Sequence, residues 1–319
     1  MLDFNHVTST PGYDVQYFVG GAAGTLVQWQ TWRKPRGVKM VYIIGVGGGS
    51  SGGTGINTGA TSGGGQGGSS GAQTAVMLPA MFVPDTLYIQ PGQGGPGQTT
   101  SGNVGVAGQP TYVAIEPGTT LTPNMTLLFA NPGAAGAAAA TATVGGTVGT
   151  AAAVATIANM PLAGRGWYNF FAGQVGTAGA ASTANGAPVV PPTTGLMVTG
   201  GAGGGGCANV SAGWGGTISN VAGALGQGIF PGLLGGNAAV TTTPAGSGTS
   251  YIASNFIMNY GGTGGGGALA GAGNVGGIAG VGGIASPGCG GGGSGGANTN
   301  NPAVQGGSGG PGFVYIVSW

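Results

Sequence analysis

Charged side chains are scarce in this chain of 319 residues, which holds five Lys or Arg, four Asp or Glu and a single histidine. They make up 3% of the sequence, whereas about a quarter is usual in soluble domains. So few proton-carrying groups disfavour an enzyme, and a formal net charge of +1 disfavours nucleic-acid binding, which needs clustered cations. The composition therefore predicts a structural or binding protein that is not an enzyme and needs no cofactor.

Signals for membranes and secretion are also lacking. The chain has no apolar run of about eighteen residues, so we expect no membrane-spanning helix. Residues 1–6 have neither the basic start nor the apolar core of a secretory signal. We therefore expect neither a membrane anchor nor export by this route.

Cysteine is limited to Cys207 and Cys289, and each lies beside a run of glycines. Two alternatives follow: the pair forms one disulfide, or each is a small buried apolar side chain. A metal centre would need more ligands than these two residues and His6 provide, so we expect none.

Motifs that imitate catalytic or nucleotide sites are incomplete. Residues 47–52 match the G-x-G-x-x-G pattern after an expected strand, but no acid follows before Asp85 and no helix is indicated. Glycoside cleavage needs two facing carboxylates, and the best pair, Asp85 with Glu116, adjoins proline turns where a capping or solvated role is expected. Neither motif supports an enzyme.

Glycine is what the chain has in abundance, with 81 residues, about a quarter of the sequence against a usual share near 7%. The glycines gather in tracts 47–71, 200–216, 261–296 and 305–312. In the third tract, every third position from 261 is Gly, Ala or Ser, and the next phase, from 262 to 295, also holds only small residues apart from Asn274. The remaining phase carries the larger residues Thr263, Leu269, Val275, Ile278, Val281, Ile284 and Pro287.

A period of three fits neither the α-helix nor the β-strand but the extended, three-residue helix of the polyproline II type. Such helices have no internal hydrogen bonds, so their backbone groups must find partners on adjacent helices. We therefore predict a packed lattice of polyglycine II helices. Two ridges of each helix would carry small residues, so that neighbouring backbones can approach closely, and the third ridge would bury the aliphatic side chains. The alternative is that these tracts are flexible linkers.

Strand-forming runs flank the glycine tracts, at residues 25–32, 40–46, 86–90, 111–115, 126–130 and 313–319. The apolar run 40–46 is expected to be buried on both faces and to share a sheet with the similar run 313–319. The predicted fold is all-β plus polyglycine II helices: a small antiparallel sheet or sandwich, from strands in 25–46 and 313–319, brackets the lattice. Residues 1–24 are expected to be an N-terminal docking segment and residues 25–319 a single glycine-rich domain.

Two groups of side chains stand out as candidate contacts. A basic turn is expected to dock to a partner protein or to be solvated, and it contains Arg33, Lys34, Arg36 and Lys39. Aromatic residues in small-residue surroundings are candidate host contacts, because rigid aromatics make good binding anchors, or else they plug the ends of the lattice. They are Trp167, Tyr168, Phe170, Phe171 and Trp214.

Three segments resemble glycine-rich proteins of bacteriophage particles. They are the run from Trp32 through Pro35 and Gly37 into residues 40–45, the run 87–92 (LYIQPG) and the closing run 309–316 (GGPGFVYI). The resemblance implies a tail-fibre or receptor-binding adhesin with packed polyglycine II helices, whose distal loops contact the host surface. It covers most of residues 25–319 and is largely one of composition.

The function expected from this resemblance is that of a virion structural protein, a fibre or spike component at the particle surface that contacts the host. Its partners would be other virion proteins and a host receptor or glycan, and a homotrimer is the natural assembly of a fibre. A capsid or head-decoration protein is the alternative within this class. A carbohydrate-cleaving fibre enzyme is the alternative from another class, which the scarcity of carboxylates disfavours.

Overall fold

The structure is a computed structural model of the whole chain. It describes residues 13–21, 28–57, 61–118, 125–138, 162, 165–192, 195–207, 212–216, 233–239, 244–250, 259–268, 278–297 and 305–319. The first twelve residues of the expected docking segment, His6 among them, lie outside these ranges, as do Leu269 and Val275.

Nine strands of the described chain form two antiparallel sheets, with one short 3-10 helix, η1 (Ala80–Phe82). The five-stranded sheet has the order β1 (Asp14–Val19), β9 (Phe313–Ser318), β3 (Met40–Val46), β4 (Gln73–Pro79) and β8 (Trp167–Phe171). The four-stranded sheet has the order β2 (Gln30–Arg33), β5 (Thr86–Gln90), β6 (Thr111–Ala114) and β7 (Thr126–Ala130). The all-β class expected from the sequence is confirmed.

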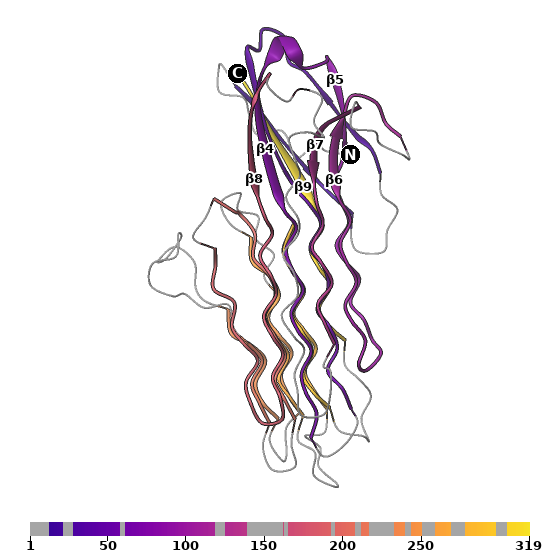
Figure 1. Cartoon of the computed structure of the whole chain (residues 1–319), viewed down its shortest axis with the longest axis vertical. Coiled ribbons are helices and arrows are strands. Elements are labelled where there is room, and N and C mark those ends of the chain that lie inside the picture. Colours follow the sequence, from indigo (N-terminus) through magenta and orange to yellow (C-terminus); the bar gives the residue numbers. More distant parts are fainter. Residues whose placement is uncertain are drawn as a thin grey trace.

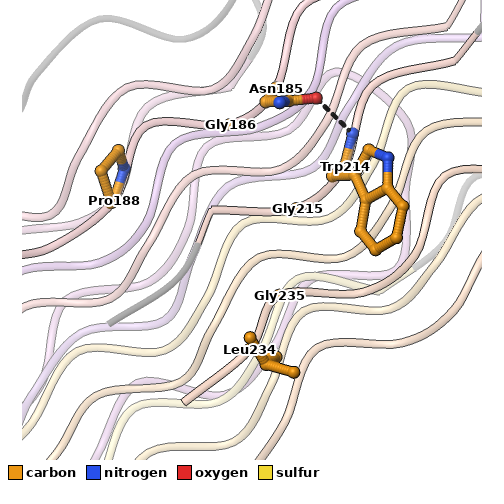
Figure 2. Close-up of a pocket in the computed structure, with 7 residues that line it drawn as sticks. All are labelled: Asn185, Gly186, Pro188, Trp214, Gly215, Leu234 and Gly235. Carbon is orange, nitrogen blue, oxygen red and sulfur yellow. Dashed lines mark hydrogen bonds between the residues drawn. The ribbon is translucent and has the colours of Figure 1, made fainter. Parts of the chain in front are cut away.

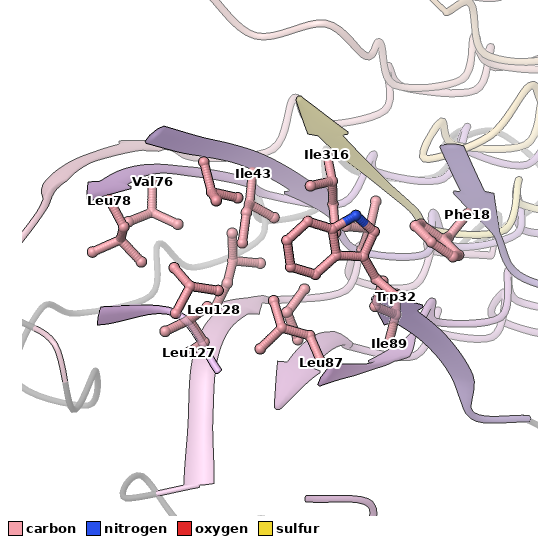
Figure 3. Packing of buried hydrophobic residues seen from close by; sticks show 14 of the residues in the cluster. Phe18, Trp32, Ile43, Val76, Leu78, Leu87, Ile89, Leu127, Leu128 and Ile316 are labelled. Atoms are coloured by element: carbon pink, nitrogen blue, oxygen red, sulfur yellow. The ribbon is translucent and has the colours of Figure 1, made fainter. Parts of the chain in front are cut away.

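The two sheets enclose one apolar core, which makes them a small sandwich (Figure 3). Trp32 of β2 is completely buried in it, together with Ile43 of β3 and Leu128 of β7. Side chains alternate along β3, β5 and β9, so Val41 and Ile43, Leu87 and Ile89, and Val314 and Ile316 all face this core. The core holds the ends of distant chain segments together, since its members range from Phe18 to Ile316.

The expected pairing of the two similar apolar runs is confirmed, because β3 and β9 lie antiparallel, with Ile43 opposite Ile316. Burial of β3 on both faces was the wrong expectation. Val41 and Ile43 are fully buried, but the alternate side chains of Tyr42 and Ile44 are only partly buried. Residues 14–19, expected within the docking segment, form strand β1 of this sheet and pair with β9.

The glycine-rich segments run side by side away from the sandwich and give the molecule an elongated shape, with the C-terminus at the sheet end (Figure 1). Each strand that leaves the sandwich continues directly into such a segment. For example, β3 leads into residues 47–57, and residues 62–72 return to β4.

Successive residues of one segment donate their backbone hydrogen bonds to three different neighbouring segments in turn. The N–H groups of residues 48, 51 and 54 donate to residues 109, 106 and 103. Those of residues 49 and 52 donate to residues 310 and 307. Those of residues 50, 53 and 56 donate to residues 69, 66 and 63. Three further segments donate in return to 47–57, through Gly95, Gly133 and residues 291, 294 and 297. Three donor and three acceptor neighbours surround this segment, so its backbone groups are paired without any ladder of a sheet.

Glycine is required where these backbones meet. A Cβ built on Gly262 would fall on the carbonyl oxygen of Gly283, and one on Gly49 would fall on that of Cys289. Buried glutamine amides continue the same bonding: Gln66 Nε2 donates to the carbonyl of Gly176, and its Oε1 accepts from the N–H of Ala137. The segments are thus packed backbone to backbone, and the flexible-linker alternative does not describe these residues.

The aliphatic ridge of residues 278–286 was expected to be buried, and it is exposed. Ile278 is 45% and Ile284 is 53% exposed, and Val281 is partly buried, whereas the glycines and alanines between them are buried. For these aliphatic residues the spacing of three is therefore correct but its direction is reversed. Small residues face the neighbouring backbones because only they fit there, and Ile278 and Ile284 are left outside. Thr263 of the same phase is fully buried, and its hydroxyl donates to the Leu234 carbonyl (3.0 Å).

Both cysteines are free thiols in buried positions, as the second of the two alternatives proposed. Cys289 packs beside Val46 and Phe313 where the sheets meet the glycine-rich body. Cys207 packs among alanines and its backbone pairs with Ser62, eleven residues before β4. Burial raises the pKa of Cys207 from 9.0 to about 11, and it also raises that of Cys289.

Stability is expected to fall in alkaline solution. Because burial raises the pKa of Cys207 to about 11 and that of Tyr168 to about 12, the folded state holds these protons more tightly than the unfolded chain does. Their contribution is complete below pH 9 and is lost as the pH rises through 11 to 12. The thermal unfolding midpoints at pH 7 and pH 8 should be equal, and the midpoint at pH 11 should be lower. A midpoint unchanged at pH 11 would contradict these burials, and Cys207→Ala should lessen the drop.

Candidate functional site

All charged side chains of the described ranges lie at one end of the molecule. They flank the ends of strands that point away from the glycine-rich body: Lys39 precedes β3, Asp85 precedes β5, and Glu116 follows β6. Residues 166–319 contain no charged side chain at all. The charged residues of this end are Asp14, Arg33, Lys34, Arg36, Lys39, Asp85, Glu116 and Arg165.

The basic turn 33–38 lines a recess of about 440 Å³ at this charged end, together with Asp85 and Thr86. The Lys34 ammonium is occupied within the fold: it donates to the carbonyls of Ala80 (3.2 Å) and Val83 (2.7 Å) and pairs with Asp85 Oδ1 (3.0 Å). Arg33, Arg36 and Lys39 are exposed. Lys34 therefore fixes the turn against η1, and the other three cations remain available to a partner.

Four of the five candidate aromatics lie on β8, at the edge of the five-stranded sheet. Trp167 is 64% exposed, beside the charged end. Tyr168 packs against the sandwich core, and its ring stacks on that of Phe170 with centroids 6.0 Å apart. Phe171 packs against the cluster at the junction with the glycine-rich body. Of these aromatics, Trp167 is the most open to a partner.

Trp214 lies elsewhere, on the glycine-rich body. The neighbouring Gly213 bonds to Gly206, close to the pairing of Cys207 with Ser62. Since Ser62 precedes β4 by eleven residues of extended chain, at about 3.1 Å per residue this region is on the order of 30 Å from the sheets. The structure thus does not bring Trp214 together with the β8 aromatics.

A groove of about 360 Å³ lies around Trp214, and Figure 2 shows the residues that line it. Three adjacent segments form it, because Gly186 N–H donates to the Trp214 carbonyl and Gly215 N–H donates to the Gly236 carbonyl. The side chains on its rim are Asn185, Pro188, Trp214 and Leu234, and glycines 186, 215 and 235 complete the lining. Trp214 is 52% and Leu234 is 75% exposed.

The sequence pointed to Trp214 but not to its three companions on the rim. Asn185, Pro188 and Leu234 come from separate segments, and only the bonding between those segments brings them together. A weak signal for two of them was present in the period of three. Asn185 and Pro188 are three residues apart and both exposed, and the exposed positions Ile278 and Ile284 are six residues apart.

No protein-family model matches the chain, and no curated protein sequence is significantly similar to it. Within the described ranges, no helix has the length and apolar character needed to span a membrane. The same ranges hold no group of three or more His, Cys, Asp or Glu side chains placed to bind a metal ion.

Proposed function

We propose that this protein is a structural component of a bacteriophage particle, a fibre or spike that presents a host-contact surface. The observation that carries the proposal is the separation of charge along an elongated molecule. The charged sandwich end offers Arg33, Arg36 and Lys39 to a neighbouring virion protein, and the uncharged glycine-rich body extends away from it.

We further infer that the glycine-rich segments are polyglycine II helices. The support is the rotation of successive N–H donors through three neighbours, which is what a helix of three residues per turn produces. The rigid packing of glycine backbones would give a spike stiffness without charged side chains. It would also leave few sites for proteases that cleave beside Lys or Arg, since none occurs after Arg165.

Association of several copies, most simply three, belongs to the same proposal. A nearly uncharged surface favours association over an isolated monomer. The partners are then copies of this chain and other virion proteins at the charged end, and a host receptor or glycan along the body. The elongated shape favours a projecting fibre or spike over a tile of the capsid shell.

The test is to produce particles from a phage that lacks this gene, complemented with the wild-type chain or with Arg33→Glu/Arg36→Glu. Reversing both exposed charges should lower incorporation of the chain by about tenfold or more, because like charges then face each other at the docking contact. Quantitative mass spectrometry of purified particles measures incorporation, and host adsorption is measured alongside it.

Glu116→Gln, at the same end, is the matched control and should incorporate normally, while thermal unfolding checks that each variant folds. Absence of the wild-type chain from purified particles contradicts a virion role. Normal adsorption by particles that lack the chain contradicts the host-contact role.

A further inference from the structure

We propose that the groove around Trp214 binds a neutral saccharide. This inference rests on the proposed function to the extent that the saccharide would belong to the host surface. It adds the site, the ligand class and the role of each side chain, none of which follows from a fibre in general.

The groove has a rigid floor. The glycines on either side of Trp214 are inserted between neighbouring backbones: a Cβ on Gly213 would fall on the Ala184 carbonyl oxygen, and one on Gly215 on that of Gly264. The Trp214 backbone is held on both sides, since its N–H donates to Asn185 Oδ1 (2.9 Å) and its carbonyl accepts from Gly186 N–H (2.8 Å). The indole is therefore presented on a fixed support, and little order must be gained on binding.

The side chains on the rim combine flat apolar surface with one polar donor. Trp214, Pro188 and Leu234 are all exposed, and the exposed surface of the groove is predominantly apolar. Asn185 uses Oδ1 for the Trp214 N–H (Figure 2), while its Nδ2 has no hydrogen-bond partner among the described residues. Such a site suits a ring with an apolar face to stack on the indole and a hydroxyl oxygen to accept from the amide.

Charge selects the neutral class of ligand. No Lys, Arg, Asp or Glu occurs anywhere in residues 166–319, so the groove has no counter-ion for an anionic or cationic group. Transfer of such a group from water onto an uncompensated apolar surface is unfavourable. Sialylated or sulfated glycans and charged peptides are thereby disfavoured relative to uncharged hexose units.

The test uses the full chain with uncharged gluco-, galacto- and manno-configured tetrasaccharides, together with a sialylated and a sulfated oligosaccharide, in titrations followed by ligand-observed NMR. At least one neutral tetrasaccharide should bind, and Trp214→Ala should weaken it about tenfold or more. Asn185→Asp keeps the acceptor for the Trp214 N–H but removes the amide donor, so it should also weaken binding while the fold is retained.

Met81→Ala removes an apolar side chain of η1 at the charged end that is 83% exposed, and it is the control, which should bind as wild type does. Binding that survives Trp214→Ala, binding of the charged glycans alone, or binding of none of these probes overturns the inference. The virion role is measured separately, through incorporation of the chain into particles. Saccharide binding can therefore be absent while the virion role is supported, and binding can be found while the virion role is contradicted.

Discussion

Replacing Gly262 by alanine is expected to destabilise the protein by at least about 3 kcal/mol, at the upper end of overpacking costs. The added methyl would occupy the position of the Gly283 carbonyl oxygen, with the Gly292 nitrogen also in contact. Neither atom belongs to a movable side chain. Two segments must therefore separate, which breaks the bonds from Ala202 N–H to the Gly262 carbonyl and from Gly262 N–H to the Gly290 carbonyl (3.0 Å each).

The control for this substitution is Gly37→Ala, in the basic turn. A Cβ on Gly37 meets nothing within 4 Å, so the cost comes only from its φ of +81° and should be about 1 kcal/mol. Denaturant unfolding midpoints of the two variants give the comparison. Equal losses for both would show that Gly262 is not packed against backbone.

Removing the Trp32 side chain is the second large effect. Trp32→Ala should cost about 3–5 kcal/mol, because it empties the centre of the only apolar core that joins the two described sheets. The indole Nε1 is buried without a hydrogen-bond partner among the described residues. Trp32→Phe keeps much of the volume and removes this unpaired donor, so it should be far less costly.

Trp167→Ala is the control for stability, since this side chain is 64% exposed and surface substitutions usually change stability by less than about 0.5 kcal/mol. Unfolding should be followed both by tryptophan fluorescence and by far-UV circular dichroism. A Trp32→Ala variant as stable as Trp167→Ala would contradict a shared core between the sheets.

Local sequence signals were sufficient for the strands that pair across an apolar core. Residues 86–90 and 126–130 match β5 and β7, because β-branched and aromatic residues end there at Pro-Gly or Asn-Pro turns. The common pattern of residues 40–46 and 313–319 was enough to place β3 and β9 together. In these cases the side chains that form the strand also form its contacts.

Strands β1, β4 and β8 were missed for a physical reason. Each carries polar residues such as Gln16, Gln73 or Asn169, and each is held by neighbours far away in the sequence rather than by its own pattern. The aromatic run of β8 was interpreted as a binding patch or as plugs at the ends of the lattice, and not as a strand. The candidate groove shows the same limit, since its rim depends on which glycine-rich segments become neighbours.

The direction of the aliphatic ridge was the instructive error. Period three fixes which residues share a face, but it does not say which face is inward. Burial of Ile284 was expected from its hydrophobicity, yet Gly282 and Gly283 take the inner positions because a Cβ there would collide with backbone at Gly292 and Thr249. Backbone hydrogen bonding outweighs aliphatic burial in this body, since unpaired buried N–H and C=O groups are strongly unfavourable.

The most direct test of the account is a density map of the assembled particle in which this chain is traced. We predict the charged sandwich against the particle and the glycine-rich body projecting from a vertex or tail. Within the body, successive residues of 261–268 and 288–296 should bond to three different neighbours. A chain lying flat at every point of the shell lattice would contradict the fibre proposal, and β-hairpins or missing density in those segments would contradict the packed glycine helices.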